Sequence, residues 1–335
     1  MAATAIPRDL FERRLLIVAG KGGVGKTTIA CALGLLGSQL GKRTLLAEVD
    51  GVGRAASLLG IEAAPIGQSR AVRSGLSVMS VEGGAALAEY LEIIVPVKRV
   101  LQAVFSSRIY QHFVAAAPGL KELMTIGKIW YEAERLDEST GRHRWDLVVV
   151  DAPATGHSLQ YLGMPRAAHE VFRAGIVGRE SQRIVDLLCD RKRTAINLVT
   201  TAEEMPVNET TEMYERIRND LKMPLGALFV NRMHDLKLDP DALDQLGHSL
   251  QLLHDNPQQQ ALAEEAVRRA REEVGWASIN RRYLRQLMKT VALPLIQVPF
   301  LFTEEFGVEQ VRSIASLLEA DLTPAARRRP KHGAA

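Results

Sequence analysis

Short apolar runs alternate with longer segments of helical periodicity along most of this chain. About seven of these runs are expected to be core strands, namely residues 15–19, 44–50, 76–81, 145–151, 195–201, 225–232 and 294–299. Many of the intervening segments repeat apolar residues with a period near 3.6, which is typical of amphipathic helices. This alternation predicts an α/β fold in which helices cover both faces of a mostly parallel, doubly wound sheet.

The helical pattern is longest in two stretches that predict a helical insert. Residues 84–140 carry apolar side chains at helical spacing, with an interruption at Pro96, and residues 163–192 also have a helical pattern. We expect one domain over residues 10–322 that includes this helical subdomain. The basic tail, residues 323–335, lacks any apolar period and is expected to be disordered.

Composition narrows the class of protein. The 335 residues are 47% hydrophobic and 24% charged, as in ordinary globular proteins. The net charge of +3 is too small to indicate a nucleic-acid partner. No run of 18 apolar residues and no signal-peptide pattern is present, so we expect a protein of the cytoplasm, with a peripheral position at the membrane left open. Cys31 and Cys189 are far apart and form no CxxC pair, which argues against a zinc site.

A glycine-rich motif follows the first apolar run. Gly20, Gly25, Lys26 and Thr27 fill the fixed positions of G-x-x-x-x-G-K-[ST], between an expected strand and an expected helix. Glycines let backbone N–H groups close around phosphate oxygens, and the helix N-terminus favours negative charge. Lys26 is expected to reach the β- and γ-phosphates and Thr27 to ligate Mg²⁺. The alternative is a tight turn with a surface lysine; the full motif predicts a nucleoside triphosphate site.

An additional lysine lies inside this loop. Lys21 follows Gly20 directly and gives G-K-G-G-V-G-K-T-T, which resembles the deviant Walker A motif of dimeric P-loop ATPases. The resemblance implies that Lys21 crosses a dimer interface to the partner's phosphates. A charge supplied in this way can be worth roughly 10³–10⁵ in rate. The alternative is a bystander lysine without a role at the interface.

Two acids stand at the carboxyl ends of expected strands. Asp151 ends the run 145–151 as a Walker B residue, and it is expected to hold Mg²⁺ through water or through Thr27. Residues 152–156 behind it resemble a switch loop. Asp50 ends the run 44–50 in a corresponding position.

Six stretches together resemble a known family over nearly the whole chain. They are the loop 20–28, the segment 151–159, the Pro-Gly segment 117–123, the segment 201–210 and the pair of segments 229–232 and 298–305. In this combination the chain resembles the bacterial arm of the arsenical-pump and tail-anchored-protein-targeting ATPase family. The resemblance implies an ATP-hydrolysing, deviant Walker A type P-loop fold.

The resemblance also implies roles for individual residues. Catalytic roles fall on Lys21, Lys26 and Asp50, where Asp50 orients the attacking water, and the dimer interface includes Lys21, Glu203 and Glu209. The ATP-binding residues that it implies are Gly20, Gly22, Gly23, Val24, Gly25, Lys26, Thr27, Thr28, Asn231, Arg232, Pro299, Phe300 and Leu301. Among these, Asn231 is expected to hydrogen-bond the adenine base.

The chain departs from the family pattern in two places. Gly51-Val-Gly-Arg54 follows Asp50, where eukaryotic targeting factors have Pro-Ala-His, so the contacts of this loop do not carry over. The paired cysteines that bind zinc or arsenite in family members are absent, and a soft-metal site needs thiolates. Arsenite pumping and a zinc-clasped dimer are therefore disfavoured.

The leading hypothesis is a Mg²⁺-dependent ATPase that works as a nucleotide-switched dimer and handles a client protein through its helical insert. The dimer could be a homodimer or a heterodimer with a paralogous ATPase, and the client could be a membrane protein. The insert could instead merely cover the sheet. Two other functions remain as alternatives: a positioning or partitioning scaffold ATPase on membrane or nucleoid, and a subunit of an arsenite-type efflux ATPase.

Overall fold

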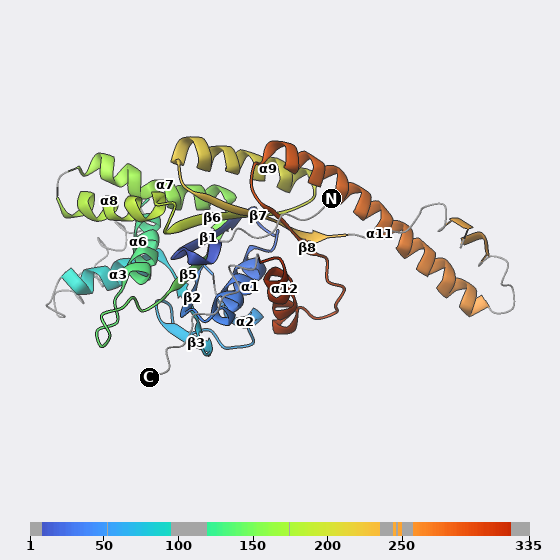
Figure 1. The fold of residues 1–335 in the computed structure, drawn as a ribbon, viewed down its shortest axis with the longest axis horizontal. Helices are drawn as coiled ribbons and strands as arrows, with labels where there is room; N and C mark the ends of the chain where they lie inside the picture. The colour runs from blue at the N-terminus through green and yellow to red at the C-terminus, as the bar shows by residue number, and fades with distance from the viewer. Residues whose placement is uncertain are drawn as a thin grey trace, which may run out of the picture.

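The computed structural model describes residues 9–51, 53–94, 119–173, 175–234, 244–245, 247–249 and 257–322. Within them, eight strands form one sheet in the order β3-β4-β2-β5-β1-β6-β7-β8 (Figure 1). The strands are β1 (Leu15–Gly20), β2 (Thr44–Val49), β3 (Ser69–Arg73), β4 (Leu76–Val81), β5 (Leu147–Ala154), β6 (Thr194–Thr201), β7 (Leu225–Met233) and β8 (Leu295–Pro299). Every pairing is parallel except that of β3 with β4. The predicted doubly wound α/β fold is confirmed.

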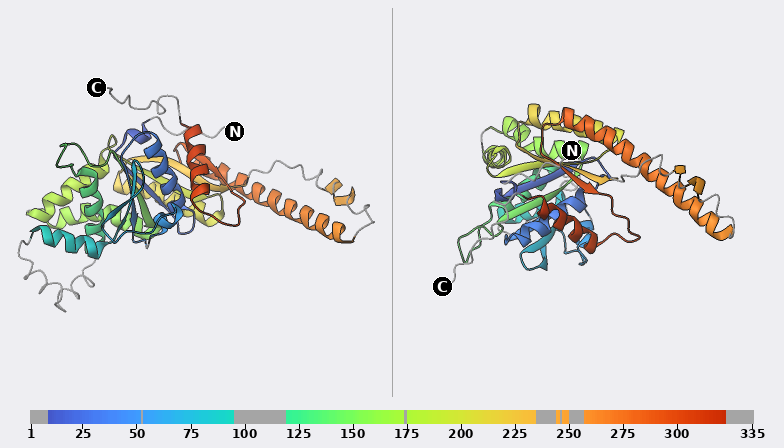
Figure 2. Two further views of the ribbon diagram at one scale, coloured as in Figure 1. Left: turned by 90° about the horizontal axis from the view of Figure 1, so that it is seen from below. Right: turned by 45° about the vertical axis from the view of Figure 1, so that its right-hand side comes forward.

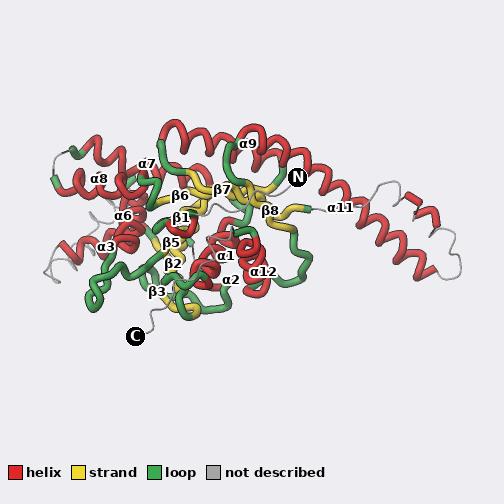
Figure 3. The backbone as a smooth tube through the Cα atoms, viewed as in Figure 1, coloured by secondary structure: helices red, strands yellow, loops and turns green. Residues whose placement is uncertain are grey.

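Helices cover the sheet on both faces, as Figure 3 shows by secondary structure. The helices are α1 (Lys26–Gln39), α2 (Arg54–Leu58), α3 (Gly83–Ile94), α6 (Leu120–Glu134), α7 (Thr155–Val171), α8 (Ile176–Cys189), α9 (Glu204–Glu215), α11 (Pro257–Thr290) and α12 (Val308–Ala320). A short 3-10 turn η1 (Leu10–Glu12) precedes β1, and a π-helical segment η2 (Arg216–Leu221) follows α9.

Alternate residues of each buried strand enter two separate cores. Leu16 and Val18 of β1 pack with α1 and α12, whereas Leu15 and Ile17 of the same strand pack with α6 to α9. Successive side chains of a strand point to opposite faces, so a strand buried on both faces must be apolar throughout. This explains why the sequence shows β1 as an uninterrupted apolar run.

The structure differs from the expected elements at three points. The strand β3 is additional: its sequence Ser-Arg-Ala-Val-Arg lies at a half-exposed sheet edge and therefore lacks an apolar run. Strand β5 continues past Asp151 to pair Ala154 with Gly20, and α7 begins at once with Thr155, where a loop was expected. The helical pattern of 163–192 divides into α7 and α8. Expectations for Pro96, for residues 95–118 and for the tail 323–335 lie outside the described residues.

Helix α11 projects from the body of the molecule. It has 34 residues, so it is about 51 Å long at 1.5 Å per residue. Its C-terminal part packs on the sheet through the buried Leu287 and Ala277, while its N-terminal part extends beyond the sheet in every view (Figures 1 and 2). Arg271 forms a 2.8 Å ion pair with Asp244 on this projecting part.

Candidate functional site

The loop between β1 and α1 has a backbone that only glycine can adopt at two positions. Gly25 has a left-handed φ of 93°, and a Cβ there would overlap the side-chain amide of Asn231. A Cβ at Gly20 would overlap the carbonyl oxygen of Val199 on β6. Val24 between them is buried, while Gly22 and Gly23 are exposed. The sequence thus folds the loop tightly against β6 and β7 and leaves its outer rim open to a ligand.

Lys26 is the first residue of α1 and its ammonium group turns back into the loop. Its Nζ donates a hydrogen bond of 3.0 Å to the carbonyl oxygen of Lys21. Burial lowers the pKa of Lys26, and the nearby carboxylate of Asp151 acts against that effect. A half-buried ammonium beside backbone N–H groups at a helix N-terminus is chemically suited to bind phosphate.

Thr27 and Asp151 meet beneath the loop. The Thr27 hydroxyl donates a 2.6 Å hydrogen bond to Oδ2 of Asp151, whose side chain is nearly inaccessible because the residue is only 6% exposed. Burial is the main cause that raises the pKa of Asp151 to about 6. The second oxygen, Oδ1, is buried without a hydrogen-bond partner. A buried carboxylate with one unsatisfied oxygen beside a hydroxyl fits the oxygen ligands that Mg²⁺ prefers.

Glu48 is a second buried acid at this site, and the sequence analysis missed it. It lies on β2 directly beside Asp151 in the parallel register, it is 2% exposed, and its charge contributes to the raised pKa of Asp151. Its carboxylate accepts hydrogen bonds from the backbone N–H groups of Arg54 (3.0 Å) and Ala55 (3.4 Å). Glu48 therefore caps α2. The available signal was an acid within the apolar run Leu45-Leu-Ala-Glu-Val49.

Asp50 is held at the end of β2 in a left-handed conformation with φ of 53°. Its backbone N–H donates to the carbonyl oxygen of Val81 (3.0 Å), and its Oδ2 accepts a hydrogen bond from the hydroxyl of Tyr161 on α7. Burial and the carboxylate of Asp50 raise the pKa of Tyr161. The loop after β2 and the helix after β5 are thus joined by a side-chain contact that no sequence motif indicated.

Lys21 pairs with an acid of its own chain. Its Nζ lies 2.9 Å from Oε1 of Glu209 on α9, and both side chains are partly exposed. Glu203 is the exposed N-cap residue of α9 and has no ion pair with Lys21. The structure therefore brings together Lys21 and Glu209, two of the three residues expected at a dimer interface.

The ends of β7 and β8 bring the expected adenine-site residues beside the P-loop. Asn231 is buried, and its Nδ2 donates a 2.9 Å hydrogen bond to the carbonyl oxygen of Val24. Arg232 is exposed and left-handed, with φ of 56°. Phe300 continues the pairing through its N–H, which donates to the carbonyl oxygen of Met233 (2.9 Å). Pro299 and Leu301 on either side of Phe300 are half-buried.

An aromatic group flanks this end of the sheet, and the sequence analysis missed most of it. His234 stacks on Phe300 at 4.6 Å between ring centroids and on Trp276 of α11 at 5.9 Å. His234 is fixed by Glu273, whose Oε1 lies 2.8 Å from Nδ1. These residues are distant in sequence, so only the tertiary structure reveals the group.

Comparison with known proteins places this arrangement among ATPases. The family model described as anion-transporting ATPase matches residues 13–181. The ATPase BagA of Mycobacterium tuberculosis is 34% identical over 241 residues, which cover 71% of this chain and 70% of that protein. An arsenical pump-driving ATPase of Escherichia coli is 28% identical over 59% of this chain and 36% of its own length. A putative arsenical pump-driving ATPase of Aquifex aeolicus is 22% identical over 93% of this chain and 80% of its own length.

Proposed function

As this chain belongs to the anion-transporting ATPase family and is an ATPase, we propose that it works as a Mg²⁺-dependent, nucleotide-switched dimer that handles a client protein. The observation that carries this proposal is the group around the P-loop. Lys26, Thr27 and the buried Asp151 converge beneath an open glycine loop. Residues 10–322 are taken as one ATPase domain, with the helices of 84–140 and 163–192 as its helical subdomain.

In this proposal Thr27 and Asp151 hold Mg²⁺, directly or through water. The unsatisfied Oδ1 of Asp151 supports the assignment, because a bound cation would offset the penalty of burying that carboxylate. Thr27 and Asp151 would hold the ion, which would supply positive charge to the phosphate oxygens. Thr27 would then give up its hydrogen bond to Asp151, and Lys26 would leave the carbonyl of Lys21 for the phosphates.

Lys21 is proposed to act on the nucleotide of the partner subunit. In the structure Lys21 forms an ion pair with Glu209 of its own chain, and both side chains are partly exposed. Exposed pairs contribute about 0–1 kcal/mol, so exchanging Glu209 for a partner's phosphate costs little. Glu203 and Glu209 would then line the interface near the partner's lysine.

The switch function rests on connections between the site and the helices. Asp50 contacts Tyr161 of α7, and α7 leads directly into α8. Release of phosphate near Asp50 and Asp151 would change the position of α7, and with it α8 and α6, which pack on it. Asp50 is proposed to orient the attacking water once the nucleotide draws it away from Tyr161.

The client surface is proposed at the junction of α7 and α8. Val171 is 72% exposed and Phe172 is 53% exposed, and Ile176 and Val177 beside them are also exposed. Contiguous exposed apolar residues of this kind mark interaction sites. By contrast, α6 buries Ile126 and Ile129 in the core, so that helix chiefly covers the sheet. In this proposal the insert has both of the roles that the sequence left open.

An arsenite-type function is not supported by the cysteines. Cys31 is buried in α1, where burial raises the pKa of its thiol, so it is a poor source of thiolate. Cys189 is a second, separate cysteine at the end of α8.

No helix among the described residues is long and apolar enough to span a membrane.

The test measures the rate of ATP hydrolysis per chain at increasing protein concentrations. Light scattering in the presence of ATP and Mg²⁺ reports dimer formation in the same samples. The proposal expects specific activity to rise with concentration as dimers form, and both signals to require ATP. Lys26→Ala should abolish turnover, whereas Lys192→Ala, an exposed control on the same background, should not. Specific activity that is constant down to concentrations at which only monomer is detected would refute the dimer.

A second assay separates the scaffold alternative. The protein is sedimented with anionic liposomes and, separately, with DNA, each with and without ATP. The pellet should contain no more protein than a control that lacks liposomes and DNA. ATP-dependent recovery in either pellet would favour a positioning or partitioning ATPase.

A further inference from the structure

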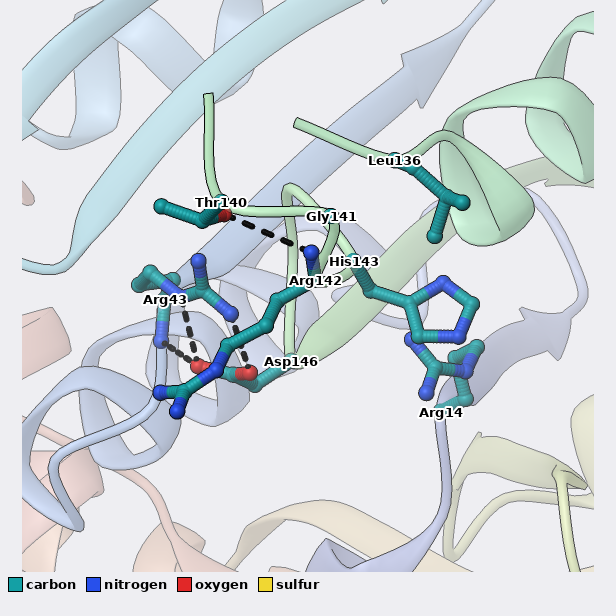
Figure 4. Close-up of a pocket in the computed structure, with 8 residues that line it drawn as sticks. All are labelled: Arg14, Arg43, Leu136, Thr140, Gly141, Arg142, His143 and Asp146. Carbon is teal, nitrogen blue, oxygen red and sulfur yellow. Dashed lines mark hydrogen bonds and ion pairs between the residues drawn. The ribbon is translucent and has the colours of Figure 1, made fainter. Parts of the chain in front are cut away.

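A pocket lies at the amino ends of the central parallel strands, whereas the P-loop lies at their carboxyl ends. Arg14, Arg43 and Asp146 immediately precede β1, β2 and β5, whereas the nucleotide-site residues follow the other ends of these parallel strands. A six-residue strand spans about 20 Å, so the pocket is separate from the nucleotide site. Its volume is about 570 Å³, within the usual range for small-molecule sites. Residues 136–143 form its other wall (Figure 4).

The lining of this pocket is cationic. Three arginines and His143 face a single acid, Asp146. Arg43 already neutralises that acid, with Nε and Nη2 donating to its two carboxylate oxygens at 2.9 and 2.7 Å. These hydrogen bonds lower the pKa of Asp146. Arg14 and Arg142 remain without a carboxylate partner from the lining.

Arg14 is a half-buried cation without a hydrogen-bonded acid. Its guanidinium donates to the backbone carbonyls of Trp145 at 3.2 Å and Ala133 at 3.5 Å, and burial lowers the pKa of Arg14. The nearby Glu134 is committed to an ion pair with Arg193. A guanidinium has five donors and is stabilised away from water only when an anion or sufficient acceptors match it.

The other wall is preformed and carries an unsatisfied group. Asp137 fixes the turn by accepting hydrogen bonds from the N–H groups of Ser139 (3.1 Å) and Thr140 (3.0 Å), and a bridge pairs Leu136 with His143. Nδ1 of His143 is shielded from solvent and has no hydrogen-bond partner. In the view of Figure 4, the Arg142 side chain extends toward Asp146, and the His143 ring lies beside Arg14.

We propose that this pocket binds a small oxyanion, a molecule that carries phosphate or carboxylate groups, between Arg14, Arg142 and His143. The planar guanidinium fork matches the oxygens of either group. The volume exceeds that needed for one inorganic ion, so the ligand class is a small metabolite with at least one such group. A phosphate ester and a carboxylic acid are the two sources of this chemistry.

The test titrates the full chain, with its P-loop saturated by ADP and Mg²⁺, with sodium phosphate and separately with sodium succinate. Binding is followed by the anion-dependent shift in melting temperature. Arg142→Ala and His143→Ala should each weaken binding by about tenfold, in line with the loss of a charge-assisted hydrogen bond. Arg179→Ala, an exposed arginine on α8, is the matched control and should bind as the wild type does.

The outcomes separate cleanly. Binding of phosphate alone identifies a phosphate ester, and binding of succinate alone identifies a carboxylic acid. Absence of binding by both probes overturns the proposal. Equal weakening in Arg179→Ala and Arg142→Ala also overturns it, because it indicates attraction by net charge alone. Melting temperatures without anion show whether each variant is folded.

Discussion

Burial of Asp151 beside Glu48 imposes an electrostatic penalty on the nucleotide-free protein. The carboxyl of Asp151 has a pKa of about 6 in the folded chain, raised chiefly by burial from the value of 3.8 that an exposed aspartate has. Between these pH values the folded state binds more protons than the unfolded state, so the Asp151 contribution to stability falls as pH rises. Above pH 6 the penalty is complete.

Asp151→Asn should therefore stabilise the nucleotide-free protein at pH 7.5 by about 1–3 kcal/mol, with the gain vanishing below about pH 4. Asparagine keeps an oxygen that can accept the Thr27 hydrogen bond. The measurement is urea unfolding in EDTA at several pH values. A variant that is no more stable than wild type at pH 7.5 would contradict the raised pKa.

At the same scale, sequence reasoning identified the residues that a motif specifies and missed those that only packing brings together. Lys26, Thr27 and Asp151 follow from fixed spacings next to recognisable strands. Glu48 and Tyr161 are ordinary residues in a strand and a helix, and their contacts depend on the register of β2 with β5 and on the position of α7. No local pattern encodes such contacts.

Among the elements, the P-loop turn allows a direct test, because a Cβ would clash with a neighbour at Gly25 but not at Gly22. Gly25→Ala forces a side chain into a left-handed position and against Asn231. It should destabilise the protein by about 1–3 kcal/mol and weaken ATP binding. Gly22→Ala is the matched control for folding, since its Cβ meets only ordinary contact with Ala154. Thermal unfolding without nucleotide compares the two; equal melting temperatures would refute the role of Gly25.

Helix α2 depends on Glu48. Glu48→Ala removes the acceptor for the N–H groups of Arg54 and Ala55 and should cost about 1–3 kcal/mol. Hydrogen exchange at these two amides should accelerate more than exchange within α1. Glu48→Gln, which keeps one acceptor oxygen, should show a smaller change. Unchanged exchange in Glu48→Ala would show that the cap is unimportant.

The elements themselves were predictable to the extent that they are buried on both faces. Strand β1 is an apolar run, and β5 is one up to Asp151, because helices cover both strands above and below. Strand β3 is half-exposed at the edge and carries two arginines, so its sequence resembles a loop. The start of α7 at Thr155 was missed because Pro153 and Gly156 are typical of loops.

At the scale of the whole molecule, the ATPase fold and the proposed dimer make different demands on the two lysines. The ammonium group of Lys26 turns back into its own P-loop, whereas that of Lys21 pairs with Glu209 on α9, and both side chains of this pair are partly exposed. The fold follows from the alternation of strands and helices, but an assembly does not, because the surface residues that form it have no periodic signature.

Complementation between two inactive variants tests the central claim most directly. In a mixed dimer, a Lys21→Ala subunit keeps its own Lys26, and the Lys26→Ala subunit supplies it with Lys21. Random pairing in an equimolar mixture gives about a quarter of the sites both lysines. The account predicts that ATP hydrolysis, nearly absent from each variant alone, recovers to about that fraction of the wild-type rate in the mixture. A mixture as inactive as its components, or full activity of Lys21→Ala alone, would contradict it.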